Sequence, residues 1–131
     1  VMEGADEVIP LLSSKYTLGL IYNTGVTPGS MLRVSLREGK LIGYFRHLTF
    51  SDEVGKIKPS PFIFLHTLGR LGVEAKEAVH IGDDLKSDIK GAKGMEMKAI
   101  LFRRDLKGEG VEEADAVISS LKELPSVLDD F

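Results

Sequence analysis

Short apolar runs alternate with amphipathic segments along the whole chain. Runs of four to eight mostly apolar residues, without a polar residue at every second position, are typical of strands in a parallel sheet that is covered on both faces. We read residues 78–81 as such a run and also expect strands at residues 16–22, 47–50 and 98–102, with a short one at 116–118. We therefore expect five strands.

Amphipathic segments with helix signals lie between these strands. Thr27-Pro28 and Ser60-Pro61 each combine a hydroxyl cap with a proline at the first helical position, which favours a helix start. The segment at residues 4–14 has a helical grouping of apolar residues, although Pro10 interrupts it. The predicted helices cover residues 4–14, 28–38, 60–71 and 84–93, and a last one begins at Ser119 or Ser120.

Glycines predict where two of these helices end. Gly39 and Gly72 directly follow the last apolar positions of their helices, as a C-terminal glycine does. A polar loop is expected over residues 51–58. On the helix at residues 60–71, the spacing predicts an apolar face formed by Phe64, Leu65, Leu68 and Leu71.

Strands that alternate with helices of this length predict βαβ units. The expected fold is therefore of the α/β class, with a parallel sheet between two layers of helices in a three-layer sandwich. The chain has 131 residues, which leaves room for one domain with one continuous core, residues 1–131.

Composition excludes several classes of function. The net charge of −3 gives no electrostatic basis for binding nucleic acid or an anionic membrane. No apolar run is long enough to cross a bilayer and no signal peptide is evident, so we expect a cytoplasmic protein. The absence of cysteine excludes disulfides and thiolate zinc sites. With one asparagine and no glutamine, the low amide and thiol content is typical of thermophile proteins.

An acidic cluster follows the apolar run at residues 78–81. Gly82 ends this strand, Asp83 and Asp84 enter the first turn of the next helix, and Asp88 lies one turn later. In parallel sheets, ligands bind at the carboxyl ends of the strands. Carboxylate oxygens favour magnesium among the common metals. The residues alone leave a second interpretation open, in which Asp83 and Asp84 cap the helix and complement its dipole.

Two further polar clusters follow predicted strands. Asn23 and Thr24 precede a helix and are suited to holding an anion, although a plain strand-to-helix turn uses the same residue types. Lys58 is held extended because Pro59 follows it, and its cation could neutralise a phosphate; the alternative is an ordinary loop lysine. His80 lies within a strand and is expected in the core or in support of a ligand.

The three clusters resemble, in order and spacing, motifs of the haloacid dehalogenase-like (HAD) hydrolase superfamily. Residues 51–59, Ser-Asp-Glu-Val-Gly-Lys-Ile-Lys-Pro, resemble its third motif, with Lys58 as the motif lysine. Residues 80–93 resemble its fourth motif, of the G-D-x-x-x-x-D type, and residues 18–25 its second. The resemblance implies a Rossmann-like HAD core.

The resemblance also implies a chemistry. HAD phosphatases form a phospho-aspartyl intermediate with Mg²⁺ bound, and the acidic fourth motif favours this reaction over metal-free dehalogenation. By resemblance, Asp83 is a metal ligand with Asp84, and Asp88 supports the site. Lys58 offsets negative charge, while Asn23 and Thr24 position the phosphate. The implied substrate is a small phosphorylated metabolite, and the implied function is hydrolysis of phosphate monoesters.

The first HAD motif, D-x-D-x-T/V, is missing from these residues. In the family it follows a central strand that lies between the strands ending at Asn23 and Gly82. We therefore expect the C-terminal part of a longer enzyme, lacking the first strand and the cap. Such a chain would be inactive alone, and it would bind its own N-terminal segment, associate with a second copy of itself, or close the gap by rearranging.

Two other positions depart from the family pattern. Tyr22 stands where the family has serine or threonine, and Glu96 where it commonly has glycine. Glu96 in a left-handed conformation would cost about 1 kcal/mol. Tyr22 and the missing aspartates favour an alternative function, a noncatalytic HAD-like domain that acts through protein contacts.

Overall fold

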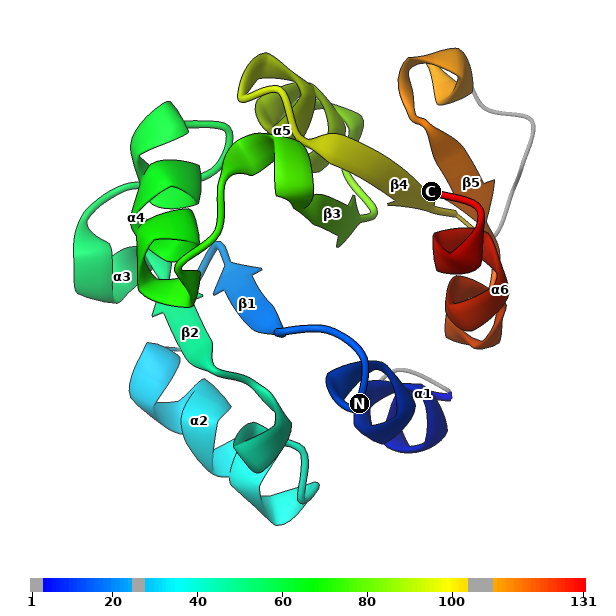
Figure 1. Ribbon diagram of the computed structural model, residues 1–131. Coiled ribbons are helices and arrows are strands. Elements are labelled where there is room, and N and C mark those ends of the chain that lie inside the picture. The colour runs from blue at the N-terminus through cyan, green and yellow to red at the C-terminus, as the bar shows by residue number, and fades with distance from the viewer. Residues whose placement is uncertain (1–3, 25–27, 104–109) are drawn as a thin grey trace.

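The computed structural model of the protein describes residues 4–24, 28–103 and 110–131. Its strands are all parallel to their neighbours and form two sheets, β1–β2 and β3–β4–β5 (Figure 1). This confirms the α/β class with parallel pairing. The strands are β1 (Gly19–Tyr22), β2 (His47–Phe50), β3 (Val79–Gly82), β4 (Lys98–Phe102) and β5 (Ala116–Ile118).

Helices and short helical segments alternate with these strands along the chain. Among the described residues, no helix is long and apolar enough to span a membrane. The longer helices are α1 (Ala5–Ser13), α2 (Gly29–Glu38), α4 (Pro61–Leu71) and α6 (Leu124–Asp129). The short helical segments are η1 (Ile42–Tyr44), α3 (Ser51–Val54), η2 (Ala75–Glu77), the π-helical η3 (Leu85–Lys90), α5 (Gly91–Gly94), η4 (Val111–Glu113) and η5 (Leu121–Glu123).

The alternation of side chains along β4 separates two core clusters. Ala99 and Leu101 pack into one cluster with α4, η3 and α5, whereas Ile100 packs into the other with α1, η5 and α6. All three side chains are fully buried. Figure 1 shows α4 and α5 on one side of the strands and α1 and α6 on the other. The expected three-layer arrangement is therefore confirmed, with β4 at its centre.

The two sheets are not joined by hydrogen bonds. In the part of the chain that the structure describes, β1 pairs with β2, β3 pairs with β4, and no pairing links β1 to β3. Leu20 and Ile21 of β1 and Ile81 of β3 are partly exposed, in contrast to the fully buried interior of β4. This is the arrangement expected of a HAD core from which the strand between β1 and β3 is missing.

The helix signals were partly right at both α4 and α2. Ser60 and Pro61 start α4 and Gly72 ends it in the left-handed region at φ 73°, but the Ser60 hydroxyl makes no capping hydrogen bond. In α2, Pro28 precedes the first helical residue and Thr27 lies outside the described residues. The residue after α2, Gly39, has ordinary helical angles, because the chain turns one residue later.

The predicted loop at residues 51–58 was wrong over its first half, which forms α3 and ends at the left-handed Gly55. The predicted apolar face of α4 was also partly wrong, since Leu65 is 57% exposed. The buried positions follow the pairs Ile63–Thr67 and Phe64–Leu68, which lie four residues apart on one side of the helix. Thr67 is polar, and its hydroxyl bonds Thr49 of β2 at 2.8 Å.

Glu96 adopts the left-handed conformation, with φ 65°. Since glycine has no Cβ to clash in this region, we expect Glu96→Gly to stabilise the protein by up to about 1 kcal/mol in a urea titration. Ser35→Gly is the matched control, because this exposed residue lies inside α2 and glycine should destabilise the helix there. Destabilisation by both variants would show that the Glu96 conformation carries no strain.

Candidate functional site

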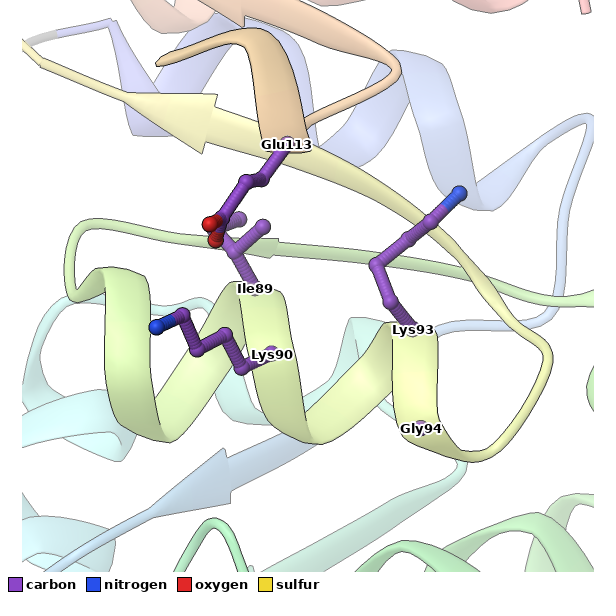
Figure 2. A pocket seen from close by; sticks show the side chains of 5 residues that line it. All are labelled: Ile89, Lys90, Lys93, Gly94 and Glu113. Atoms are coloured by element: carbon purple, nitrogen blue, oxygen red, sulfur yellow. The ribbon is translucent and has the colours of Figure 1, made fainter. Parts of the chain in front are cut away.

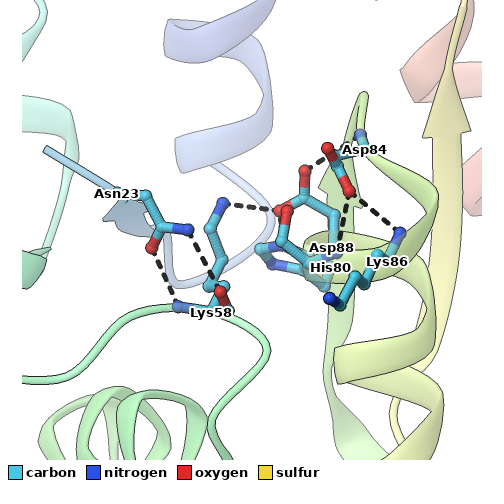
Figure 3. Close-up of polar contacts among 7 residues, drawn as sticks. Asn23, Lys58, His80, Asp84, Lys86 and Asp88 are labelled. Atoms are coloured by element: carbon cyan, nitrogen blue, oxygen red, sulfur yellow. Dashed lines mark hydrogen bonds and ion pairs between the residues drawn. The ribbon is translucent and has the colours of Figure 1, made fainter. Parts of the chain in front are cut away.

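The polar clusters that follow β1, β2 and β3 meet at one place. A chain of hydrogen bonds runs from Asn23, after β1, through Lys58 to Asp88 in η3 (Figure 3). Because the carboxyl ends of parallel strands meet at one edge of a sheet, residues far apart in sequence come within contact there. The structure therefore brings together the predicted residues Asn23, Lys58 and Asp88.

Asn23 holds the backbone of Lys58. Its side-chain Oδ1 accepts a bond from the Lys58 N–H at 2.8 Å, and its Nδ2 donates to the Lys58 carbonyl at 3.2 Å. The Asn23 amide thus bonds both backbone groups of Lys58, as a neighbouring strand would. It thereby fixes the main chain from which the lysine side chain extends. An asparagine amide has two N–H donors, so one remains for another acceptor.

The ammonium group of Lys58 is paired with a buried carboxylate. Lys58 Nζ lies 2.5 Å from Asp88 Oδ1, and the two side chains are 11% and 4% exposed. His80 Nε2 lies 2.9 Å from the same oxygen, and the backbone N–H of Asp84 donates to Oδ2 at 3.2 Å. Both oxygens of Asp88 are therefore satisfied, as a buried carboxylate requires.

These partners decide the protonation state of Asp88. Burial by itself raises the pKa of the Asp88 carboxyl, but the bonds from His80 and Lys58 outweigh it and hold the pKa well below its ordinary value. Asp88 is therefore ionised at neutral pH and forms a compact ion pair with Lys58. Two of the three protons of the Lys58 ammonium remain for other acceptors.

Gly82 makes room for Asp88 at the end of β3. A Cβ on Gly82 would lie 2.1 Å from Asp88 Cγ and 2.4 Å from Asp88 Cβ, which is far inside contact distance. The glycine of the G-D-x-x-x-x-D pattern is thus needed for space, because the carboxylate of the last aspartate sits against its Cα. Gly82 and Asp88, six positions apart in the sequence, are therefore packed directly against each other.

Asp84 and Asp83 have different environments. Asp84 Oδ1 accepts the backbone N–H groups of Lys86 and Ser87 at 2.9 and 2.8 Å, and the Ser87 bond in particular lowers the pKa of the Asp84 carboxyl. Asp84 is thus the N-cap of η3, as the second sequence interpretation held. Asp83 is exposed and, within the described residues, has no side-chain partner.

The donors present fit a magnesium ion in part. The described residues contain no group of three or more acidic or histidine side chains arranged around a common metal position. Asp83 offers a carboxylate without a partner, and Asp84 keeps the oxygen that does not cap the helix. These hard oxygen donors suit Mg²⁺, which keeps several waters and takes few protein ligands.

Thr24 belongs to a hydroxyl network with the start of α3. Its N–H donates to Ser51 Oγ at 2.7 Å, its Oγ1 accepts the Asp52 N–H at 3.1 Å, and the two hydroxyl oxygens lie 2.8 Å apart. One hydroxyl proton joins the two oxygens, so the other is left to donate elsewhere. The network therefore provides one donor at the strand ends, next to Asn23.

Sequence reasoning missed Ser51, Asp52 and the bond made by His80. The Asp52 carboxylate accepts the N–H of Gly29 at 3.1 and 3.3 Å and so caps α2 from 23 residues away. Ser51 directly follows β2, so its place at a strand end was a signal that could have identified it. His80 lies eight residues before Asp88, and only the fold brings the two side chains together.

One hollow in the described surface is lined by residues other than Asn23, Lys58 and Asp88. It measures about 460 Å³ and is lined by Ile89, Lys90, Lys93, Gly94 and Glu113 on the outer side of η3 and α5 (Figure 2). Within the described part of the chain, no side-chain bond links these residues to Asn23, Lys58 or Asp88, and Lys93 is paired with Asp115 at 2.9 Å. The candidate site is thus defined by the polar network of Asn23, Lys58 and Asp88.

Comparisons with known proteins identify the family of the chain. A sequence profile of the family described as haloacid dehalogenase-like hydrolase matches residues 1–102. A glyceraldehyde 3-phosphate phosphatase of Pyrococcus furiosus is 37% identical over 115 residues, which cover 82% of this chain and 48% of the relative. The chain spans about half the length of the curated relatives it matches, or less.

Solved structures give the same fold. A HAD phosphatase from Thermococcus onnurineus superposes with a TM-score of 0.83 at 36% identity, over 98% of this chain and 58% of that one. A 2-haloacid dehalogenase from Pseudomonas syringae pv. tomato superposes with a TM-score of 0.85 at 31% identity, over 99% of this chain and 54% of that one. Both phosphatases and dehalogenases thus share this arrangement.

The contact between Gly82 and Asp88 can be tested by substitution. We expect Gly82→Ala to destabilise the protein by about 1–3 kcal/mol in a urea titration, because the added methyl group displaces the Asp88 carboxylate. Gly69→Ala is the matched control, since a Cβ there meets nothing within 4 Å and alanine favours the helix by about 1 kcal/mol. A neutral Gly82→Ala variant would contradict the packing described here.

Proposed function

The chain belongs to the family of haloacid dehalogenase-like hydrolases, and on this basis we propose that it is part of a cytoplasmic, magnesium-dependent phosphatase of small phosphate monoesters. The observation that supports this most is the paired ammonium of Lys58, which lies at the strand ends beside Asn23 and within one network with Asp88. A fixed cation at such an edge suits a phosphoryl group, whose reaction requires positioning and charge stabilisation.

Each residue has a distinct role in this proposal. Lys58 turns its two free ammonium protons toward phosphoryl oxygens while the third stays on Asp88. Asn23 orients Lys58 through its backbone and, together with the hydroxyl pair of Thr24 and Ser51, donates to the remaining phosphate oxygens. Asp88 is a positioning residue, because it touches Lys58 and is itself buried.

Asp83 and Asp84 would hold Mg²⁺, which when bound supplies positive charge to offset the phosphate and the attacking carboxylate. The exposed Asp83 is the primary ligand in this scheme. Asp84 contributes the oxygen that does not cap η3 and links the metal site to Asp88 through its N–H.

We place the aspartate nucleophile and the acid two residues beyond it in a segment outside this sequence, since no D-x-D occurs within it. The reaction would then pass through a phospho-aspartyl intermediate, and residues 1–131 would be one partial core domain, inactive alone. Among the described strands, β1 and β3 each have one edge without a partner, and there a strand from the protein's own N-terminal segment, or from a second copy of the chain, would complete the sheet.

Phosphate esters are favoured over haloacids as substrates by the acidic pair Asp83-Asp84, because cleavage of a carbon–halogen bond by this family needs no metal. The curated relatives include phosphatases named for glyceraldehyde 3-phosphate and ribulose 1,5-bisphosphate. A small phosphorylated metabolite is therefore the proposed substrate, and glyceraldehyde 3-phosphate is the first compound to assay.

A noncatalytic role through protein contacts is the second candidate, and one observation favours it. Tyr22 ends β1 beside Asn23 and is 47% exposed, so a bulky phenol stands next to the proposed phosphate position. A complete gene without a D-x-D-x-T segment upstream of β1 would support this second function.

The assay uses the full-length protein that contains this chain, with p-nitrophenyl phosphate and Mg²⁺. We expect Lys58→Ala and Asp83→Ala each to lower kcat/KM by about 100-fold or more, since Lys58 would supply positive charge to the phosphoryl group and Asp83 would hold the Mg²⁺ that does the same. Lys76→Ala is the matched control, because this lysine side chain is 78% exposed on η2. Turnover that survives both Lys58→Ala and Asp83→Ala would exclude these residues from the reaction.

A further inference from the structure

His80 makes the second side-chain bond to Asp88. It lies in β3, and its Nε2 is 2.9 Å from the Asp88 oxygen that also receives Lys58. The side chain is 12% exposed, so the bond is largely shielded from water. A polar side chain within a strand of an α/β core needs a partner of this kind, and Asp88 supplies it.

The ring of His80 is fixed from the other side by Phe64 of α4. The two rings meet edge to face, with centroids 5.2 Å apart and planes at 86°. Phe64 is fully buried, and its ring lies so close to Gly91 that a Cβ there would be 2.8 Å away. Packing therefore sets the direction in which the imidazole points, and that direction is toward Asp88.

The charge of Asp88 sets the tautomer of His80. A carboxylate that is ionised accepts hydrogen bonds and has no proton to give, so the imidazole nitrogen that faces it must carry a proton. In the neutral ring this is the Nε2–H tautomer, and in the charged ring Nε2 is protonated as well. His80 is thus a donor to Asp88 in either state.

We propose that His80 is a positioning residue that keeps the Asp88 carboxylate in place, so that the ammonium of Lys58 is presented at the strand ends. The effect of this positioning role on turnover rests on the proposed function. When the Lys58 ammonium donates hydrogen bonds to phosphoryl oxygens, its bond to Asp88 weakens. If Lys58 were the only donor to Asp88, this buried carboxylate would then have too few hydrogen bonds. His80 and the Asp84 N–H keep both oxygens of Asp88 bonded, which lets Lys58 share its protons.

Two variants separate the effect of the hydrogen-bond donor of His80 from the effect of its ring. His80→Phe keeps a ring against Phe64 but has no donor, whereas His80→Gln places an amide N–H near the position of Nε2 without a ring. The readout is the rate at which acetic anhydride labels Lys58, followed by mass spectrometry. Lys76 is the internal reference, because its side chain is 78% exposed on η2 and, among the described residues, makes no hydrogen bond or ion pair with Lys58, His80 or Asp88.

We expect His80→Phe to raise the labelling of Lys58 relative to Lys76 by about tenfold, because a displaced Asp88 no longer holds the ammonium. His80→Gln should remain within about twofold of the unmodified protein, since the donor is kept. The opposite order, or no change in either variant, would overturn the proposal. Because no turnover is measured, the result is independent of whether the protein is a phosphatase.

A second measurement uses the unmodified chain, so it does not depend on whether a variant folds. Nitrogen-15 NMR of the unmodified chain above neutral pH reports which ring nitrogen of His80 carries the proton. The proposal requires the Nε2–H tautomer. A neutral His80 protonated at Nδ1 would overturn it, because an unprotonated Nε2 cannot bond an ionised carboxylate.

Discussion

The burial of one negative charge, that of Asp88, is the constraint on which the rest of this site depends. An ionised carboxylate with almost no exposure is tolerated when donors surround it, and here a lysine, a histidine and a backbone N–H do so. The residues around it follow from this need. Gly82 gives the carboxylate space, and the start of η3 turns the Asp84 N–H toward it.

The hydrogen bonds around Asp88 also join the two sheets, between which the described residues show no strand pairing. Asn23 follows β1 and bonds the backbone of Lys58, while Lys58 reaches across to Asp88, which follows β3. A polar bridge therefore connects the β1–β2 sheet to the β3–β4–β5 sheet at their carboxyl ends. Since the bridge is also where a phosphoryl group would bind, the stability of this edge and its proposed chemistry depend on the same atoms.

Local patterns were enough to predict most of the fold. The strands at residues 47–50, 98–102 and 116–118 were predicted with the bounds that the structure shows, because periodicity and composition along a short segment are a strong local signal. The meeting of Asn23, Lys58 and the acidic cluster also followed, since parallel strands share one carboxyl edge.

What the sequence could not show were contacts made across long stretches of chain. The Asp52 carboxylate accepts the N–H of Gly29 in the first turn of α2, and nothing in the local sequence around the helix start points to this residue. The turn after α2 uses Lys40 at φ 62° although Gly39 stood one residue earlier. At the start of α2 a contact from 23 residues away takes the place of a local signal, and a single sequence carries no record of it.

The central claim, that Lys58 and Asp88 form one buried, mutually dependent unit, is tested most directly by a double-mutant cycle. The free energies of unfolding of the unmodified chain, Lys58→Met, Asp88→Asn and the double variant would be measured by urea titration at neutral pH. Because the bond is charged at both ends and shielded from water, we expect an interaction energy of about 1.5–3 kcal/mol. Additive effects, within about 0.5 kcal/mol, would contradict the account.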